Sequence, residues 1–362
     1  MSELHPLAWS VYDIADQIDR FKESTYPENQ HWIKEGDEGL EKARLTLLGD
    51  LEAMKRQLQS PEEALSDIMY FPADLASLLI IHDLNLPQLI PPSGSISYDD
   101  LVMSHNTQTG TCVEEDPLRR IISYAITKGI FREPERGRVA HSELSLLLRD
   151  SGLFELLGVS LQELLPALLR LPDAFTSPRE SIEPNETAYN IAHGTDLPMY
   201  RFLQQHPERA KRFGRAMSHG RHVDNHFLQQ SFAWAKYDSP GMTIVDVGGG
   251  HGNAAAFLAS STKHMRFIVQ DLDHIVAAGK AMLPAELRSR VDFTAHDFFD
   301  EQPVKGADVY LLARIMLNWS EKYCLKILRA LVPALKVGAK ILFYEHVFDA
   351  TAEYRGNHKE KW

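Results

Sequence analysis

Apolar residues in the first half of the chain recur at the spacing of α-helices. One such stripe, within residues 1–60, consists of Leu40, Ala43, Leu47, Leu48, Leu51 and Met54. Beyond it, the pattern predicts helices over 73–82, 97–102 and 117–128, and two short strands over 130–132 and 138–141 around a turn-rich segment. Helix, helix and hairpin in this order are the arrangement of a winged-helix domain.

A different pattern begins near residue 241, where short β-rich runs alternate with helical ones. The predicted strands are 243–247, 266–270, 291–295, 309–312 and 340–344, and the helices between them are 253–260, 274–281 and 322–335. This alternation is typical of an α/β fold with a parallel, doubly wound, Rossmann-like sheet. The predicted parts are an N-terminal helical segment (1–60), a winged-helix domain (61–185), a helical linker (186–240) and the Rossmann-like domain (241–362).

Composition and charge narrow the class of partner. The net charge of −12 disfavours nucleic acid and anionic membranes, and no basic recognition helix accompanies the winged-helix pattern. Two cysteines are too few for a disulfide framework, which favours a reducing, cytoplasmic compartment. No signal peptide is evident, and we expect no apolar stretch long enough to span a bilayer. The sequence therefore predicts a protein that acts on small molecules.

A glycine-rich turn follows the first strand of the second half, with the sequence DVGGGHG over 246–252. Glycine lets the backbone approach a ligand, and the helix behind the turn presents free N–H groups. Asp246, ahead of the glycines, would repel a diphosphate but suits a ligand with positive charge. S-adenosyl-L-methionine (SAM), which carries an ammonium and a sulfonium, is the natural candidate. The predicted contacts in this turn are Asp246, Gly248, Gly249, Gly250 and Gly252.

Acidic residues follow the next two strands. Asp271 ends the strand 266–270, about 20 residues past the glycines, where a carboxylate accepts hydrogen bonds from ribose hydroxyls. Asp297, after the strand 291–295, could accept from an adenine amino group, and Phe298 beside it could cover the ring. The alternatives are a helix cap or loop acid for Asp271, and a loop aspartate beside core phenylalanines for Asp297.

Together with the run Trp319-Ser320-Glu321-Lys322-Tyr323, these motifs resemble the SAM-dependent O-methyltransferases of the plant caffeate type, particularly their fungal secondary-metabolite branch. The resemblance covers about residues 40–348 and includes Gln270-Asp271-Leu272. It implies a class I methyltransferase domain, a homodimer joined through the N-terminal half, and a small aromatic or polyketide-type substrate. By family position it adds Leu272 to the cofactor contacts. Substrate contacts on the same basis are Phe213, Met217 and Asn318, although core packing explains the first two equally well.

One departure from the family concerns the general base. The family has a histidine two residues before the tryptophan, where this chain has Leu317. Glu345 matches the acidic residue that orients this histidine, so it is expected to lack that partner. A phenol with a pKa near 10 is roughly 0.1% ionised at pH 7, so a missing base costs up to about 4 kcal/mol. An acidic hydroxyl or a carboxyl group needs mainly alignment with the methyl group. The sequence therefore predicts an acidic substrate oxygen.

The other departure lies at the C-terminus, where the family continues with a helix and two more strands. Here only the polar segment 350–362 follows, which predicts a shortened sheet with an exposed edge. His346, beside Glu345, and His141, on the predicted hairpin, are alternative bases; a strand-end position and a structural hydrogen bond are the competing explanations. His141 matches a histidine of SAM-binding pericyclases in the fungal branch.

The alternatives to methyl transfer are thus a pericyclase or cyclase on this fold and an inactive dimerisation partner. No metal site is expected, because His219, His222 and His226 have no cysteine or carboxylate partners at ligand spacing.

Overall fold

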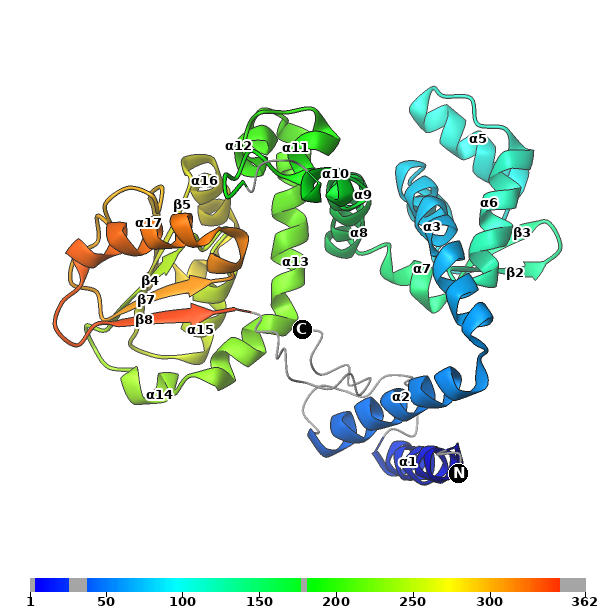
Figure 1. Cartoon of the computed structure of the whole chain (residues 1–362), viewed down its shortest axis with the longest axis horizontal. Coiled ribbons are helices and arrows are strands. Elements are labelled where there is room, and N and C mark those ends of the chain that lie inside the picture. Colours follow the sequence, from blue (N-terminus) through cyan, green and yellow to red (C-terminus); the bar gives the residue numbers. More distant parts are fainter. Residues whose placement is uncertain (1–3, 26–37, 177–180, 346–362) are drawn as a thin grey trace. The chain divides into compact units, whose positions relative to one another are not determined.

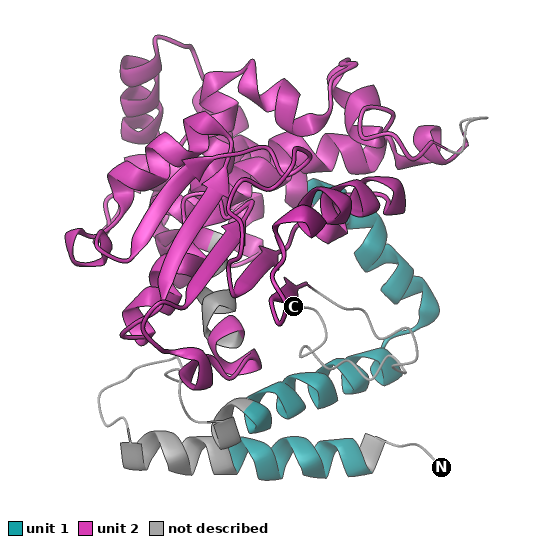
Figure 2. Ribbon diagram, turned by 90° about the vertical axis from the view of Figure 1, so that its left-hand side faces the viewer, with its two compact units in different colours: residues 1–73, 346–362 teal, residues 74–345 magenta. Residues whose placement is uncertain are grey.

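The computed structural model describes residues 4–25, 38–176 and 181–345 (Figure 1). It divides the chain into two compact units, of which one is formed by residues 74–345 (Figure 2). The described part of residues 1–73 belongs to the other unit. The four-part division expected from the sequence stays a prediction.

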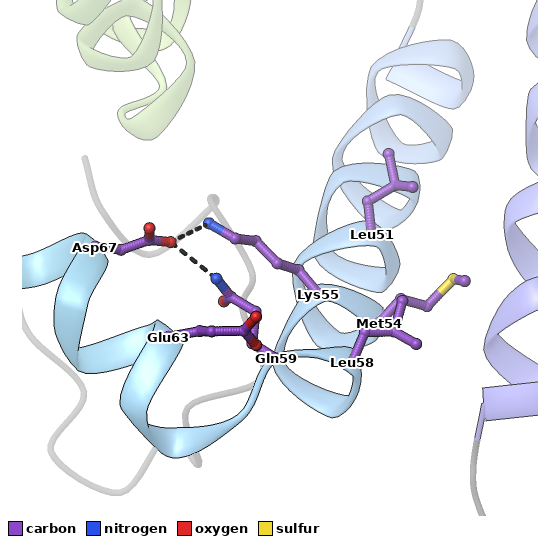
Figure 3. A pocket seen from close by; sticks show the side chains of 7 residues that line it. All are labelled: Leu51, Met54, Lys55, Leu58, Gln59, Glu63 and Asp67. Carbon is purple, nitrogen blue, oxygen red and sulfur yellow. Dashed lines mark hydrogen bonds and ion pairs between the residues drawn. The ribbon is translucent and has the colours of Figure 1, made fainter.

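Helices make up the described part of the first unit. They are α1 (Leu4–Thr25), α2 (Glu38–Leu58) and the first part of α3 (Pro61–Asp83). Ser60 and Glu63 start α3 with a capping box, in which each side chain bonds the backbone N–H of the other. At the corner between α2 and α3, Asp67 Oδ2 accepts hydrogen bonds from Lys55 Nζ (3.1 Å) and Gln59 Nε2 (2.9 Å), beside a surface hollow (Figure 3). These contacts are exposed and set the direction of the corner.

The helix predicted over 73–82 is longer than expected. It begins at Pro61, and Pro72 lies inside it rather than before it. The capping box at Ser60 is the start signal that the apolar pattern alone did not reveal.

The second unit begins with helices and a small antiparallel sheet. Its first elements are the end of α3, α4 (Leu86–Leu89), β1 (Ile96–Ser97), α5 (Tyr98–Thr109), α6 (Glu115–Thr127), β2 (Phe131–Glu135), β3 (Arg138–His141) and α7 (Glu143–Leu147). The strand order is β1-β3-β2, and Ser97 Oγ caps α5 by accepting from the Asp100 N–H at 3.1 Å. The predicted helices and hairpin are present, around a core that includes Ile81, Leu101, Ile122, Phe131 and Val139.

A helical segment follows. It consists of α8 (Ser151–Gly158), the π-helix η1 (Val159–Leu164), α9 (Leu165–Leu169), α10 (Leu171–Phe175), α11 (Ala188–His193), α12 (Met199–Gln204), α13 (Pro207–Ser231) and α14 (Trp234–Tyr237). The expectation that no stretch has the length and apolar character of a membrane span is wrong. The helical runs Pro61–Asp83 and Ser151–Leu169 both have them, because isolated acids such as Asp74 and Glu163 interrupt the apolar sequence without lowering its average much. Both windows are mostly exposed in the described structure, with 11% and 22% of them buried.

The rest of the unit is a five-stranded parallel sheet with helices between the strands (Figure 1). Its elements are β4 (Thr243–Val247), α15 (Asn253–Ser261), β5 (Arg266–Asp271), α16 (Asp273–Met282), β6 (Val291–Ala295), β7 (Val309–Ala313), η3 (Met316–Asn318), α17 (Glu321–Leu331) and β8 (Lys340–Tyr344). Every predicted strand is present, which confirms the predicted fold class. The last helix ends earlier than expected because Pro333 cannot continue it, and a 3₁₀ turn follows.

Both faces of the sheet are covered. On β4, Ile244 packs into a core with Leu258 of α15, whereas Val245 and Val247 pack into a second core with Ile327 of α17. Successive side chains of a strand point to opposite faces, so burial on both faces explains the continuous apolar runs in the sequence.

The strand order is β6-β5-β4-β7-β8. The chain thus proceeds from β4 to β6 in one direction and returns to place β7 on the other side of β4. Ligands of such sheets bind at this reversal, outside the carboxyl ends of the strands. Among the described residues no strand pairs with the outer edge of β8, where Phe343 is exposed.

Candidate functional site

The glycine-rich turn lies at the carboxyl end of β4, where the strand order reverses. Gly248 has a φ of 70°, and a Cβ there would lie 2.6 Å from Ile315 Cδ1. A Cβ on Gly249 would lie 2.5 Å from Asp246 Oδ2. The turn therefore requires glycine at both positions and passes close to the Asp246 carboxylate. A hydrogen bond from Gly252 N to Gly249 O closes it at 3.0 Å, directly before α15.

Asp271 holds this turn in place from the end of β5. Its Oδ2 accepts a hydrogen bond from Gly250 N at 2.9 Å, and its Oδ1 accepts from Leu272 N at 2.8 Å. A carboxylate has about four acceptor positions, so each oxygen can still accept a second bond, as from a ribose hydroxyl. Leu272 precedes α16 and contributes its backbone N–H to the arrangement.

Asp297 and Phe298 approach the same turn from the end of β6. Phe298 Cε1 lies 3.4 Å from the position that a Gly248 Cβ would occupy. Asp297 Oδ1 accepts from Phe299 N at 3.1 Å, and Oδ2 lies 3.4 Å from Arg201 Nη2 on α12. The sequence did not point to Arg201, because it is 96 residues away and follows no local motif.

His296 is a further residue that the sequence did not single out. Its backbone N–H donates to Asp271 O at 2.9 Å, so it lies between the two proposed acidic contacts. Its Nε2 is buried and has no hydrogen-bond partner among the residues that the structure describes. Burial lowers the pKa of the His296 ring, partly opposed by the charges of Asp297 and Asp300, so the ring is neutral at pH 7.

These residues fit an adenosyl cofactor by their chemistry. Two carboxylates, Asp271 and Asp297, can accept from hydroxyl and amino groups, and their charge suits a cationic ligand. Phe298 offers an aromatic surface, and the glycines keep the turn free of side chains. His296 Nε2 is a buried polar atom that a ligand could satisfy. The structure thus brings together the cofactor contacts predicted from three separate strand ends.

The position of the family's general base lies on η3, after β7. Leu317 is 54% exposed there and offers no proton acceptor. Glu345 Oε1 accepts from the N–H groups of Ile315 (3.0 Å) and Met316 (2.9 Å), while Oε2 is buried without a partner among the described residues. Glu345 therefore has a structural role even without the histidine, because it holds the backbone of the turn that carries Leu317.

Asn318 also serves this turn. Its Nδ2 donates to Arg314 O at 3.0 Å, and Arg314 has a left-handed backbone with a φ of 57°. A non-glycine residue in this region is strained, and such strain is concentrated at functional sites. The rest of the Asn318 side chain is exposed, as a substrate contact would require.

Aromatic rings connect α13 to this region. Phe213 packs edge-to-face on Tyr200 (5.9 Å between centroids), and Tyr200 stacks on Trp319 (6.4 Å). Trp319 in turn contacts Phe298 at 5.9 Å. Met217, one turn beyond Phe213, is partly buried. The candidate substrate and cofactor residues are thus joined through one aromatic chain.

His141, one of the two alternative bases, does not join this site in the described structure. His141 is buried, its Nδ1 bonds Ser145 Oγ at 2.9 Å, and its Nε2 bonds Ile90 O at 3.1 Å. Burial lowers the pKa of the His141 ring. Both nitrogens are engaged within the small antiparallel sheet region, which favours the structural explanation. His346 lies outside the described residues, as do the side chains of His222 and His226.

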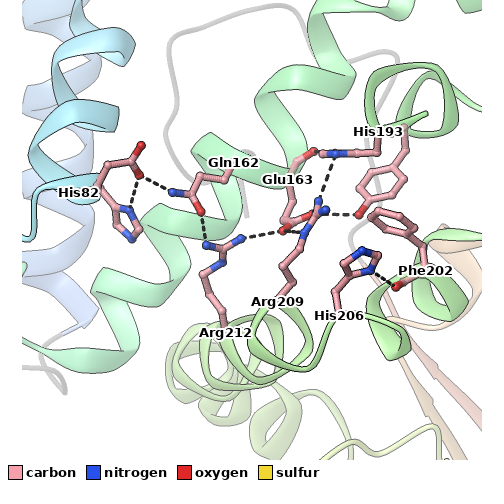
Figure 4. Close-up of polar contacts among 10 residues, drawn as sticks. His82, Gln162, Glu163, His193, Phe202, His206, Arg209 and Arg212 are labelled. Atoms are coloured by element: carbon pink, nitrogen blue, oxygen red, sulfur yellow. Dashed lines mark hydrogen bonds and ion pairs between the residues drawn. The ribbon is translucent and has the colours of Figure 1, made fainter. Parts of the chain in front are cut away.

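A buried ionic cluster, which no sequence motif indicated, fastens α13 to the π-helix η1 (Figure 4). Glu163 is fully buried and accepts from Arg209 Nε and Arg212 Nη2, each at 2.7 Å, and from Tyr189 OH at 2.9 Å. Burial alone would raise the pKa of Glu163, but the hydrogen bonds from Arg209, Tyr189 and Arg212 lower it to about 2. Gln162 extends the contacts from Arg212 to Asp83 at the end of α3.

Among the described residues, no three His, Cys, Asp or Glu side chains gather in a group that could hold a metal ion.

Comparison with known proteins identifies one family. The family model for the O-methyltransferase domain matches residues 170–361. O-methyltransferase AMT9 of Alternaria alternata is 40% identical over 65% of this chain and 55% of its own length. O-methyltransferase VdtC of Byssochlamys spectabilis is 34% identical over 84% of this chain and 71% of its own. A chlorophenol O-methyltransferase of Trichoderma longibrachiatum is 33% identical over 80% of this chain and 62% of its own. The chain thus spans little more than half of the length of some of these relatives.

Solved structures agree on the fold. OxaC is 20% identical, with a TM-score of 0.77 over 96% of this chain and 85% of that one. An enzyme described as a pericyclic reaction enzyme is 22% identical, with a TM-score of 0.73 over 95% of this chain and 85% of that one. LepI has been crystallised with SAM, and OxaC with SAH and oxaline. At these identities the likeness concerns the fold.

Proposed function

The chain belongs to the O-methyltransferase domain family, and we propose that it transfers a methyl group from SAM to an oxygen of a small molecule. The observation that carries this proposal is the meeting of the glycine turn, Asp271, Asp297 and Phe298 at the carboxyl ends of β4, β5 and β6. SAM is the cofactor of this family, and neighbours of the same fold have been crystallised with it or with S-adenosylhomocysteine (SAH).

Each residue of the site has a proposed role in holding the cofactor. The glycine turn admits it, with Asp246 providing negative charge beneath the turn. Asp271 accepts from the ribose hydroxyls while it holds Gly250, and Asp297 accepts from the adenine amino group. Phe298 covers the adenine ring. When bound, SAM supplies a methyl group on a sulfonium sulfur, which a nucleophilic oxygen can accept in a dry, aligned site.

We propose that the substrate oxygen is acidic. The hydroxyl proton has to leave before the oxygen attacks, and Leu317 has no atom that could take it. For an ordinary phenol the missing base raises the barrier by up to about 4 kcal/mol at pH 7. An already ionised hydroxyl or carboxylate avoids this loss. The relative that methylates chlorophenol, a phenol acidified by its halogens, supports this class of substrate.

The biological setting follows from the relatives. They include a methyltransferase of the grayanic acid biosynthesis cluster of Cladonia grayi, 32% identical over 96% of this chain. This supports a role in fungal secondary metabolism, with a small aromatic or polyketide-type substrate bound near Phe213, Met217 and Asn318. The cytoplasm, predicted from the cysteine count and charge, is the proposed compartment.

We further propose a homodimer formed through the N-terminal half, with residues 61–185 as a winged-helix dimerisation domain. Apolar side chains on α3 support this, because Leu65, Ile68 and Met69, which lie three and four residues apart on one face, are each more than half exposed. Large apolar patches of this kind mark protein contacts. Analytical ultracentrifugation of the full chain should give twice the 41.0 kDa mass of one copy.

The proposal is tested by binding and turnover. Calorimetry should show uptake of SAM and SAH, and a chlorinated phenol with enough chlorine atoms to be ionised at pH 7 should be methylated much faster than unsubstituted phenol. Leu317→His should raise the rate with phenol and leave the chlorinated phenol nearly unchanged. Leu325→His, at an exposed leucine on the following helix α17, is the matched control and should change neither rate. Absence of SAM and SAH binding to folded protein would refute the proposal.

A second candidate function is a SAM-binding pericyclase or cyclase. Leu317 favours it, because such a reaction needs no proton acceptor at this position, and the fold is shared with a pericyclic reaction enzyme. This alternative predicts a product isomeric with its precursor and formed without release of SAH. Mass spectrometry of product and cofactor distinguishes the two functions.

A further inference from the structure

We propose that His251, in the glycine turn, is a positioning residue that couples the cofactor site to α13. In this arrangement, cofactor binding orders the helix that carries the proposed substrate contacts Phe213 and Met217. The inference rests on the proposed binding of SAM at the turn.

The contact between the turn and the helix is specific. Ser218 Oγ of α13 lies 2.9 Å from His251 Nδ1, within hydrogen-bond distance. One helical turn earlier, Gly214 leaves room for the imidazole, since a Cβ there would lie 3.0 Å from His251 Cε1 and 3.4 Å from Nε2. Asn253, at the start of α15, also donates to Ser218 O at 3.4 Å. The imidazole is therefore seated on α13 by the Ser218 hydrogen bond and by its close approach to Gly214.

The backbone of His251 is held from another side. A Cβ on Gly279 of α16 would lie 2.9 Å from His251 Cα and 3.0 Å from His251 O. Helix α16 packs tightly against the backbone of His251, and α13 packs against its side chain. If the turn shifts when a ligand binds, α16 leaves little room for the His251 backbone to move toward it. The shift should therefore move the imidazole and, with it, α13.

Helix geometry connects this contact to the substrate side. Gly214 and Ser218 are four residues apart and share one face of α13. Phe213 and Met217 each precede them by one residue and form a neighbouring stripe, rotated by about 100°. A rotation of α13 that optimises the Ser218 contact therefore changes the direction in which the Phe213 and Met217 side chains point. Phe213 also contacts Tyr200, which stacks on Trp319 beside the turn that carries Leu317.

Hydrogen exchange measures this coupling directly. In the wild-type chain, SAH should slow amide exchange in peptides that cover residues 207–219. In Ser218→Ala this protection should fall by about fivefold or more, the lower end of typical couplings between sites. Because coupling between two sites is reciprocal, the affinity for SAH should fall by no more than the same factor. Ser218→Thr, which keeps a hydroxyl, should restore the protection.

Two further variants separate coupling from general damage. Ser231→Ala is the matched control, because its hydroxyl lies on the same helix and bonds Leu228 O; it should behave as wild type. Gly214→Ala keeps every hydrogen-bonding group but pushes the imidazole away from α13 by a few tenths of an ångström, so SAH should give less protection than in wild type. With an ionised chlorinated phenol as probe, both coupling variants should raise the KM of the phenol about fivefold or more at saturating SAM.

The outcomes distinguish this inference from the proposed function. Equal protection of 207–219 by SAH in wild type, Ser218→Ala and Gly214→Ala would overturn the coupling and leave the cofactor site intact. Failure of the wild-type chain to bind SAH would overturn the proposed function itself.

Discussion

Replacement of Glu163 by glutamine should strongly destabilise the protein. The change keeps the shape of the side chain but removes the negative charge that faces Arg209 and Arg212. Glu163 is fully buried, and the two arginines are only 26% and 18% exposed. The amide nitrogen of glutamine would also place a donor where Tyr189 and the arginines donate. The variant therefore leaves two poorly hydrated cations without their counter-ion.

The expected loss in the free energy of unfolding can be worked out in two independent ways. Removing one partner from a buried ion pair costs about 3 to 5 kcal/mol. The pKa of Glu163 falls from 4.5 to about 2, which at about 1.36 kcal/mol per unit corresponds to on the order of 3 kcal/mol. We expect a loss of about 3 kcal/mol or more in the free energy of unfolding, a large part of the typical 5 to 15 kcal/mol of a domain.

Urea unfolding followed by circular dichroism at pH 7 measures this loss. Glu155→Gln is the matched control, because Glu155 on α8 also pairs with α13, through Arg215 at 3.1 Å. Arg215 is 52% exposed, so this pair should contribute about 1 kcal/mol or less. Similar losses for both variants would refute the argument that burial makes the Glu163 cluster costly to break.

The stability difference between wild type and Glu163→Gln should also depend on pH. Since the pKa of Glu163 is lower in the folded state, its contribution to stability is fully present above the unfolded value near 4.5 and disappears as the pH falls toward about 2. The difference between wild type and Glu163→Gln should therefore be constant from pH 7 to 5 and shrink below pH 4.5. A difference that stays constant down to pH 3 would contradict the assigned pKa.

Three shorter predictions concern the candidate site and its alternatives. Asp271→Asn should weaken SAM binding about tenfold or more in calorimetry, because it removes the charge that holds Gly250 and faces the ribose; unchanged affinity would speak against this role. Gly249→Ala should weaken SAM binding at least as much, since its Cβ would collide with the Asp246 carboxylate 2.5 Å away. His141→Ala should lower the free energy of unfolding by about 1 to 3 kcal/mol and leave kcat unchanged in the soluble fraction, since both ring nitrogens make structural hydrogen bonds. A large fall in kcat would instead make His141 a catalytic candidate again.

Local signals account for what the sequence determined by itself. The strands of the parallel sheet are short apolar runs, and Thr243–Val247 and Lys340–Tyr344 have the bounds that the pattern predicted. The glycine turn is equally local, because tight backbone curvature excludes side chains wherever it occurs. The acids at the strand ends could be located because parallel strands place their carboxyl ends at one edge. The residue at the base position, Leu317, is likewise a fact of the sequence.

Only the tertiary structure decided which groups these residues meet. Asp271 bonds the glycine turn, Glu345 bonds the backbone before Leu317, and Arg201 reaches Asp297, across distances in the chain that no periodicity links. Glu163 was an isolated acid in an apolar run until α13 packed its arginines against it. The physical reason is that apolar spacing reports which face of an element is buried, whereas the partner of a charge depends on which elements fold back against that face.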